Sequence, residues 1–187
     1  MRVGPIAGLV GIAVFLAILI LLDNRLVRLR YRVGSSWSEI DGHLGKRYEL
    51  VPNLVEAVQG YTGHERETLA QVTELRGAAM RAGTPGEKAK ADNMLTETLR
   101  SLFAVVENYP ALKADAHFQD LMKQLRELDD NIEYARRYYN ASVRDYNIAT
   151  AVFPSRIVAG AFSFTPAEFF ELSDPEKRKP AKVAFAR

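Results

Sequence analysis

The stretch VGPIAGLVGIAVFLAILILL, residues Val3–Leu22, decides the fold, because it contains no charged side chain. As a helix that rises about 1.5 Å per residue, it reaches roughly 30 Å, the thickness of the hydrocarbon core of a bilayer. A buried helix of a soluble domain rarely has so long a run without a polar face. The sequence therefore predicts a transmembrane anchor, residues 1–23, in front of a helical body.

A cleavable signal peptide is the alternative interpretation of this stretch. The apolar run is longer than the core of an ordinary signal peptide, and the residues after it, Leu21-Leu22-Asp23-Asn24-Arg25, offer no small-residue cleavage site. We therefore expect the anchor to be retained.

The charged residues on either side of the apolar run predict its orientation. Arg2 is the single charged side chain before the run, whereas four arginines follow it closely: Arg25, Arg28, Arg30 and Arg32. Basic residues favour the cytoplasmic side, so we expect the N-terminus outside and the body in the cytoplasm. Each arginine near the surface should also attract anionic lipid, by about 1 kcal/mol.

Three glycines in the anchor, Gly4, Gly8 and Gly11, predict a surface for helix association. The Gly4–Gly8 spacing of four is the one that lets membrane helices approach closely. The alternative is that glycine is simply frequent in membrane helices.

Composition excludes several classes of function. The chain has no cysteine, which rules out disulfides, thiol nucleophiles and cysteine-ligated metals. The net charge of +2 comes from interleaved acids and bases rather than from a basic face, so we do not expect nucleic acid as a partner.

Apolar residues in steps of three and four predict a helix that continues to Arg81, but Pro52 interrupts it. Two arrangements are open: the chain folds back at Pro52 into a four-helix bundle, or residues 24–51 form a stalk covered by neighbouring subunits. We favour the bundle and expect subunit contacts through Trp37, Ile40 and Leu44. We also expect Asn53 to bond a backbone group freed by the proline, and the body's helical glycines, including Gly34, Gly42 and Gly45, to mark close packing.

Two further helices are predicted with defined ends. Thr84-Pro85-Gly86-Glu87 has the pattern of a capping box, and the helix that it opens ends before Pro110. The next helix has an unbroken seam of threes and fours, typical of coiled-coil packing, and Pro154 stops it. Its members are Phe118, Leu121, Leu125, Leu128, Ile132, Ala135, Tyr139, Ser142, Tyr146, Ala149 and Phe153.

The end of the chain predicts two short capped helices and a tail. Ser155 is expected to cap the first, and Thr165-Pro166-Ala167-Glu168 to cap the second. Residues 173–187 form a polar basic tail. The predicted fold is all-α, with an antiparallel up-and-down bundle over residues 24–172.

The sequence offers little that resembles a catalytic or metal site. His64-Glu65 resembles the start of a zinc protease helix, but the second histidine that such a site needs is replaced by Thr68. We therefore expect neither a metal nor another cofactor, and no enzyme activity.

Tyr139-Asn140 and Tyr146-Asn147, seven residues apart, occupy equivalent positions on their helix. They fit either a strip that binds a peptide or ligand, or an internal polar ladder that fixes helix register, which we favour.

Motifs throughout residues 24–171 resemble the LemA family of bacterial membrane-anchored helical proteins. The motifs that carry the resemblance are NRLV (24–27), SWSEID (36–41), KRYELVPNLV (46–55), GYTGHE (60–65), LFAV (102–105), YPALKA (109–114), the two Tyr-Asn pairs, FPS (153–155) and FFE (169–171). The sequence departs from the family's pattern at Gly34, Gly42 and Gly45, where the family usually has polar or larger residues.

The resemblance implies an N-out, single-pass protein with a cytoplasmic four-helix bundle, no established enzyme activity and no cofactor. One type of member resembles proteins needed to build magnetosome membranes. We therefore expect a self-associating scaffold of the bacterial inner membrane that organises membranes or partner proteins. The rivals are an adaptor that regulates a membrane protease or another membrane enzyme through Trp37, Pro52 and Asn53, and an enzyme that uses Tyr61, His64 and Glu65.

Overall fold

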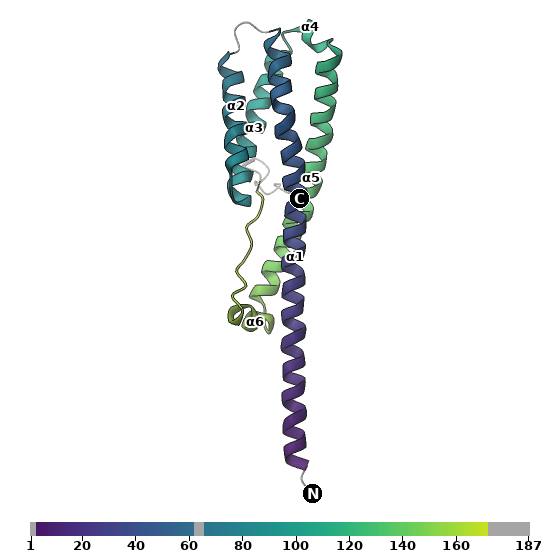
Figure 1. The fold of residues 1–187 in the computed structure, drawn as a ribbon, viewed down its shortest axis with the longest axis vertical. Helices are drawn as coiled ribbons and strands as arrows, with labels where there is room; N and C mark the ends of the chain where they lie inside the picture. The colour runs from purple at the N-terminus through teal and green to yellow at the C-terminus, as the bar shows by residue number, and fades with distance from the viewer. Residues whose placement is uncertain (1–2, 62–65, 172–187) are drawn as a thin grey trace, which may run out of the picture. The chain divides into compact units, whose positions relative to one another are not determined.

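The computed structural model describes residues 3–61 and 66–171, with the side chains of residues 9–61 and 66–171, and all regular structure in these ranges is helical (Figure 1). The helices are α1 (Val3–Gln59), α2 (Arg66–Arg81), α3 (Pro85–Val106), α4 (Pro110–Lys113), α5 (Ala116–Ala151) and α6 (Ser155–Ala161). The all-α prediction is confirmed. His64, Glu65 and the predicted tail 173–187 lie outside the described residues.

The chain forms two compact units, and both long helices contribute to each. Unit 1 contains Met1–Arg47 and Leu125–Phe169, so it joins the first part of α1 to the second part of α5 and to α6. Unit 2 contains Tyr48–Gln124 and Phe170–Arg187, so it holds the end of α1, then α2, α3 and α4, and the start of α5. Within unit 2, α2 and α3 pack directly against each other.

The anchor and the start of the body are one helix. α1 runs without a break from Val3 to Gln59, and the predicted reversal at Pro52 is wrong. The reversal comes after Gln59, which also corrects the prediction that the first helix continues to Arg81. Because the turn begins at Gly60, the proline lies inside the helix rather than at its end.

Arg76 of α2 stabilises α1 at Pro52. Proline lacks the N–H that would bond the carbonyl four residues back, which here is the carbonyl of Tyr48. The Arg76 Nε donates a hydrogen bond to that oxygen at 2.6 Å. The group freed by the proline is therefore bonded by a side chain of the neighbouring helix, and not by Asn53 as predicted.

Tyr48 also links α1 to α3. Its side chain is buried, and its hydroxyl lies 3.2 Å from the buried Asp92 carboxylate, to which it donates. The capping box that begins α3 is confirmed, since the Thr84 hydroxyl accepts from the Glu87 N–H and the Glu87 carboxylate accepts from the Thr84 N–H, at 3.2 Å each. The start of α3 is thus fixed by its own cap, and the core of unit 2 contains a polar contact between α1 and α3.

The seam predicted for α5 is buried along almost its whole length. Leu128 is half-buried, and the terminal Phe153 is 75% exposed, whereas the other nine members lie in the core. On α1, the side chains of Leu26, Ile40 and Leu44 are buried within unit 1. The predicted stalk therefore has intrachain partners, because α5 and α6 cover it.

The end of α6 sets the course of the chain that follows. Ser163 adopts a left-handed conformation with φ of 55°. The Phe164 N–H then bonds the Ala159 carbonyl at 2.9 Å, and the Ser163 N–H contacts the Gly160 carbonyl at 3.5 Å. These are the two bonds of a Schellman C-cap, here with serine in the position that glycine usually takes.

Both caps predicted for this region are wrong. Ser155 is the first residue of α6, and its hydroxyl donates backwards to the carbonyls of Ala149 and Val152 rather than capping α6. Residues 163–171 are not helical, so Thr165 caps nothing.

The body glycines do not mark close packing within the chain. A methyl group built on Gly34, Gly42 or Gly45 would meet nothing within 4 Å. The prediction of tight contact at these positions is therefore wrong for the protein's own packing.

We predict that the hydrogen bond from Arg76 stabilises the folded protein because Pro52 has no N–H to bond the Tyr48 carbonyl. Arg76→Leu should lower the free energy of unfolding by about 1–3 kcal/mol, since it leaves a carbonyl without its donor. In a Pro52→Ala background the restored amide can bond the Tyr48 carbonyl, so the cost of Arg76→Leu should fall. Denaturant unfolding of the full chain in detergent, followed by circular dichroism, measures both costs.

The exposed Arg81, on the same helix, provides the matched control. Arg81→Leu should cost little in either background. An equal cost of Arg76→Leu with and without Pro52 would contradict this role for Arg76.

Candidate functional site

A strip of polar side chains on α5 holds an extended segment of the same chain. We call Tyr139, Tyr146 and Asn147 the α5 strip, and residues 164–168 the C-terminal strap. The Tyr139 hydroxyl donates to the Glu168 carbonyl at 2.7 Å, and the Tyr146 hydroxyl donates to the Thr165 carbonyl at 3.0 Å. Asn147 donates to the Ala167 carbonyl at 2.9 Å and accepts from the Ala167 N–H at 2.8 Å.

The strip recognises main chain rather than side chains. All four bonds end on backbone atoms of the strap, and Asn147 pairs with Ala167 much as a neighbouring strand would. These contacts are internal to the chain, as in the favoured structural interpretation, but they hold an extended segment rather than a neighbouring helix. Binding of a separate peptide or ligand at the repeat stays a prediction.

Trp37 supports the strip from α1. Its ring lies 5.5 Å from the ring of Tyr139, at an interplanar angle of 54°. Such tilted aromatic pairs contribute about 0.5–1.5 kcal/mol beyond their buried area. Trp37 is half-buried by this contact, which lies inside unit 1.

Ile40 and Leu44 are completely buried within the chain. Their side chains are therefore not available to a neighbouring subunit in this fold, which corrects the prediction of subunit contacts at these two residues. Pro52 and Asn53 are exposed on α1, so contact with a partner at these positions stays a prediction.

Burial changes the acidity of the strip. Loss of hydration, helped by the nearby Glu168 charge, raises the pKa of Tyr139 to about 12. Loss of hydration also raises the pKa of Tyr146, which the positive charge of Arg30 partly offsets. Both hydroxyls therefore remain hydrogen-bond donors at neutral pH.

An ion pair joins α1 and α5 within unit 1. The Arg47 Nε lies 3.5 Å from an Asp129 carboxylate oxygen, and the Arg47 side chain is almost completely buried. Arg137, by contrast, pairs with Glu133 on its own helix, at 3.8 Å.

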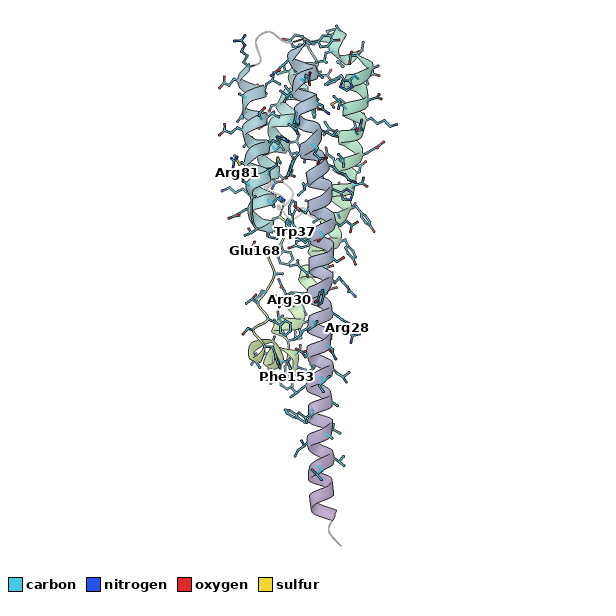
Figure 2. All side chains as sticks on the ribbon, in the orientation of Figure 1. Arg28, Arg30, Trp37, Arg81, Phe153 and Glu168 are labelled. Atoms are coloured by element: carbon cyan, nitrogen blue, oxygen red, sulfur yellow. The ribbon has the colours of Figure 1, made fainter. Side chains whose placement is uncertain are left out.

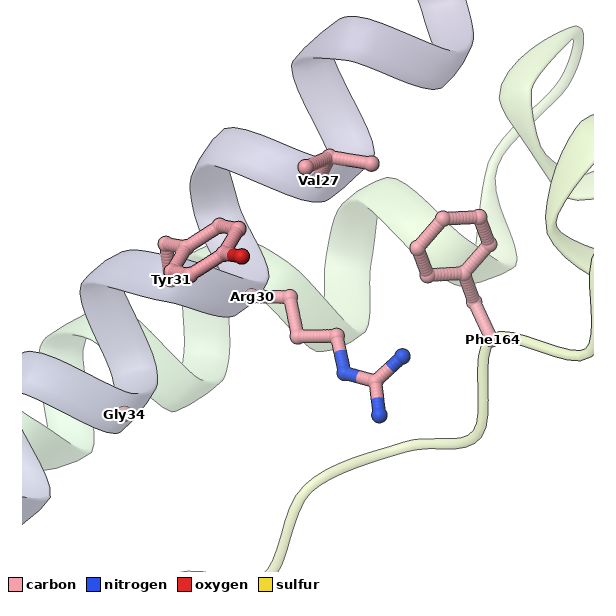
Figure 3. A pocket seen from close by; sticks show the side chains of 5 residues that line it. All are labelled: Val27, Arg30, Tyr31, Gly34 and Phe164. Carbon is pink, nitrogen blue, oxygen red and sulfur yellow. The ribbon is translucent and has the colours of Figure 1, made fainter.

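The four arginines after the apolar run are all exposed, and Figure 2 labels Arg28 and Arg30 on α1. Arg28 donates to the Asn24 carbonyl of its own helix at 3.2 Å. Arg30 lines an open pocket of about 480 Å³ with Val27, Tyr31, Gly34 and Phe164. Figure 3 shows its guanidinium directed into the space between α1 and the segment that carries Phe164. A cation at the mouth of an open pocket suits an anionic group.

The described residues give no support for metal chemistry. Among residues 3–61 and 66–171, no group of three or more histidine, cysteine or carboxylate side chains could hold a metal. Tyr61, which the enzyme interpretation used, donates to Asp115 at 3.4 Å.

Two features of the site have no clear signal in the sequence. Arg76 resembles any other surface arginine until the fold brings it to the Tyr48 carbonyl. The strap was predicted as a capped helix because Thr165-Pro166-Ala167-Glu168 has the local pattern of one. The Tyr-Asn repeat is the one signal in the sequence for the contact between strip and strap, but it does not identify the segment that the repeat holds.

We predict that alkaline pH weakens the contact between strip and strap. The unfolded chain loses the Tyr139 proton near pH 10, whereas the folded chain retains it to about pH 12. The stabilisation is therefore complete below pH 10 and is lost as the pH rises through about 12. Tyrosinate absorbance should contain a component with a midpoint near 12 that Tyr139→Phe removes; removal of a component near pH 10 instead would contradict the buried contact.

Residues 36–185 match the LemA family in a comparison with protein families. Magnetosome protein MamQ 2 of Paramagnetospirillum magneticum is 25% identical over 199 residues, which cover 90% of this chain and 73% of that protein. Magnetosome protein MamQ of Magnetospirillum gryphiswaldense is 22% identical over 89% of this chain and 73% of its own length. Protein LemA of Metamycoplasma hominis is 22% identical over 89% of this chain and 76% of its own length.

The family match covers most of the chain, including both Tyr-Asn pairs and the strap. The apolar start of α1 precedes the match, and by its length and composition this helix is apolar enough to cross a membrane. Together these observations describe a membrane-associated helical protein. The chain belongs to the LemA family.

Proposed function

We propose that this protein is a scaffold of the bacterial inner membrane that holds partner proteins, or further copies of itself, beside the bilayer. The observation that carries the proposal is the continuity of α1, from an apolar run with exposed side chains to a helix buried in the protein core. A helix of this kind fixes the body to the membrane without a flexible linker.

Charge supports an orientation with the N-terminus outside and the body in the cytoplasm. Arg25, Arg28, Arg30 and Arg32 follow the apolar run and are exposed, so they are free to interact with anionic headgroups. The pocket beside Arg30 suits a phosphate-bearing headgroup. This orientation places the strip and the strap in the cytoplasm.

Self-association, in this proposal, uses the anchor. Ile40 and Leu44 are enclosed by the chain itself, which leaves the glycines of the apolar run as the better candidates. Gly4 and Gly8 lie one helical repeat apart on α1, and a methyl group built on Gly11 would meet nothing within 4 Å. Open glycines in a lipid-facing helix permit close approach of a second helix.

The proposal assigns the protein a binding role and no catalytic one. The MamQ relatives are named as magnetosome proteins, which is consistent with a role in organising membranes. An adaptor of a membrane protease or other membrane enzyme is the second candidate. The exposed Pro52 and Asn53 favour it, because they offer a fixed surface on an uninterrupted helix.

Cross-linking in native membranes, read by mass spectrometry, tests the proposal. We predict that the full-length protein is captured with further copies of itself and with other membrane proteins. Gly8→Leu should reduce self-capture several-fold, because the larger side chain separates the helices. Recovery of the wild-type protein as an uncross-linked monomer, with no partner, would contradict the scaffold.

Ala13→Leu is the matched control, since it adds the same side chain on a different face of the anchor. It should leave self-capture unchanged. Loss of self-capture in both variants would indicate general damage to the anchor rather than a specific glycine surface. Capture of one membrane enzyme without self-capture would favour the adaptor.

A further inference from the structure

Exposed apolar side chains gather where α5 meets α6. Outside the anchor, the large exposed isoleucine, valine, leucine and phenylalanine side chains of the described residues all lie within residues 148–162, apart from Phe169. They are Ile148, Val152, Phe153, Ile157 and Phe162, and we call them the α6 corner. Phe153 is 75% exposed and Ile157 is 60% exposed, so water would meet most of their surface. Large exposed apolar side chains concentrated in so short a stretch suit a contact surface.

The buried side chains next to the α6 corner pack on the end of the apolar run. Leu26, Ala149, Val158 and Ala159 form a core cluster, and Leu19 and Leu22 of the apolar run pack against it. Leu19 lies about 4.5 Å inside the end of that run, at 1.5 Å per residue. If Val3–Leu22 spans the bilayer, α6 therefore lies level with the boundary between acyl chains and headgroups.

The corner also has the charge pattern of an interfacial element. Between Asp145 and Glu168 the sequence contains one charged side chain, Arg156. Arg156 is exposed, and its long side chain can reach phosphate while its methylene groups remain among lipid. Interfacial helices of this kind bury their apolar face by about 5–10 Å.

Hydrogen bonds within the chain satisfy backbone groups at both ends of α6. The N–H groups of Arg156 and Ile157 bond the carbonyls of Val152 and Pro154, at 2.8 and 3.1 Å. The Ser155 hydroxyl, also at the start of α6, donates to the Ala149 carbonyl. At the other end, the Phe164 N–H bonds the Ala159 carbonyl. Entry into lipid therefore leaves few polar groups without a partner, which is the main cost of burial there.

We propose that the α6 corner inserts into the bilayer interface as a second membrane contact beside the anchor. The inference rests on the proposed anchoring by α1, because the depth of α6 follows from that of Leu19 and Leu22. The proposed occupant of the corner is lipid. The core cluster around Leu26 joins α6 to the apolar run of α1, which itself needs lipid, and the positive charge of Arg156 suits anionic headgroups.

Single-cysteine variants of the full-length protein test this directly, since the chain contains no cysteine. An environment-sensitive fluorophore is attached at Ile157→Cys, at Leu16→Cys in the anchor, and at Glu133→Cys. Glu133 is exposed and lies about 27 Å from Ala151, the end of α5, at 1.5 Å per residue, so it is the control for a site in water. The proteins are placed in vesicles of phosphatidylethanolamine and phosphatidylglycerol, and quenched either by lipid with a shallow nitroxide or by iodide in the buffer.

The proposal expects the label at position 157 to lose most of its fluorescence to the nitroxide lipid and little to iodide, with the reverse at position 133. Quenching of position 157 by iodide, while nitroxide lipid quenches position 16, would overturn the α6 insertion but leave the anchor intact. Protection of position 157 from both quenchers would also overturn it, because protein rather than lipid would then cover the corner. Quenching of position 16 by iodide would overturn the anchoring itself.

Discussion

One continuous helix carries both an exposed apolar run and a face buried in the protein core, and the rest of the structure depends on that constraint. In α1, the side chains from Leu9 to Leu21 are mostly exposed, whereas Leu26, Ile40 and Leu44 are buried by the chain itself. No loop separates the two parts, so in the proposed anchoring the level at which α5 and α6 pack on α1 also sets their level in the membrane. The helix continues past Pro52, where the Arg76 side chain bonds the carbonyl that the proline leaves free.

The strap has a consistent place in this arrangement. After α6, the Schellman cap at Ser163 directs the chain along α5, where Tyr146, Asn147 and Tyr139 hold its backbone in turn. Its start is tied to the α6 corner through Phe164, which packs on the cluster of Leu26 and Val158. Main-chain recognition places few demands on the strap's side chains, so the strip needs only an extended segment at this position. The contacts that hold the strap thus also stabilise the end of α6.

Periodicity in the sequence predicted the elements that are long and amphipathic. The seam from Phe118 to Ala149, the capping box at Thr84 and the helical conformation of the apolar run all follow from local pattern, because each depends on neighbours within a few turns of helix. The errors came where a distant residue decides the outcome. Pro52 was expected to break its helix because the sequence cannot show Arg76 beside it, and Thr165 resembled a cap because the strip that extends the strap lies on another element. Phe153, the exposed last member of the seam, shows that one apolar pattern can run from the core out onto the surface.

The central claim, that anchor and body are one helix, is tested most directly by a distance across their junction in lipid. Spin labels at Leu21→Cys and Lys46→Cys, both exposed positions of α1, can be measured by pulsed electron resonance in vesicles. An uninterrupted helix predicts one narrow distribution near 38 Å, at about 1.5 Å per residue. A broad distribution, or a clearly shorter distance, would show a joint between membrane and body and would contradict the account.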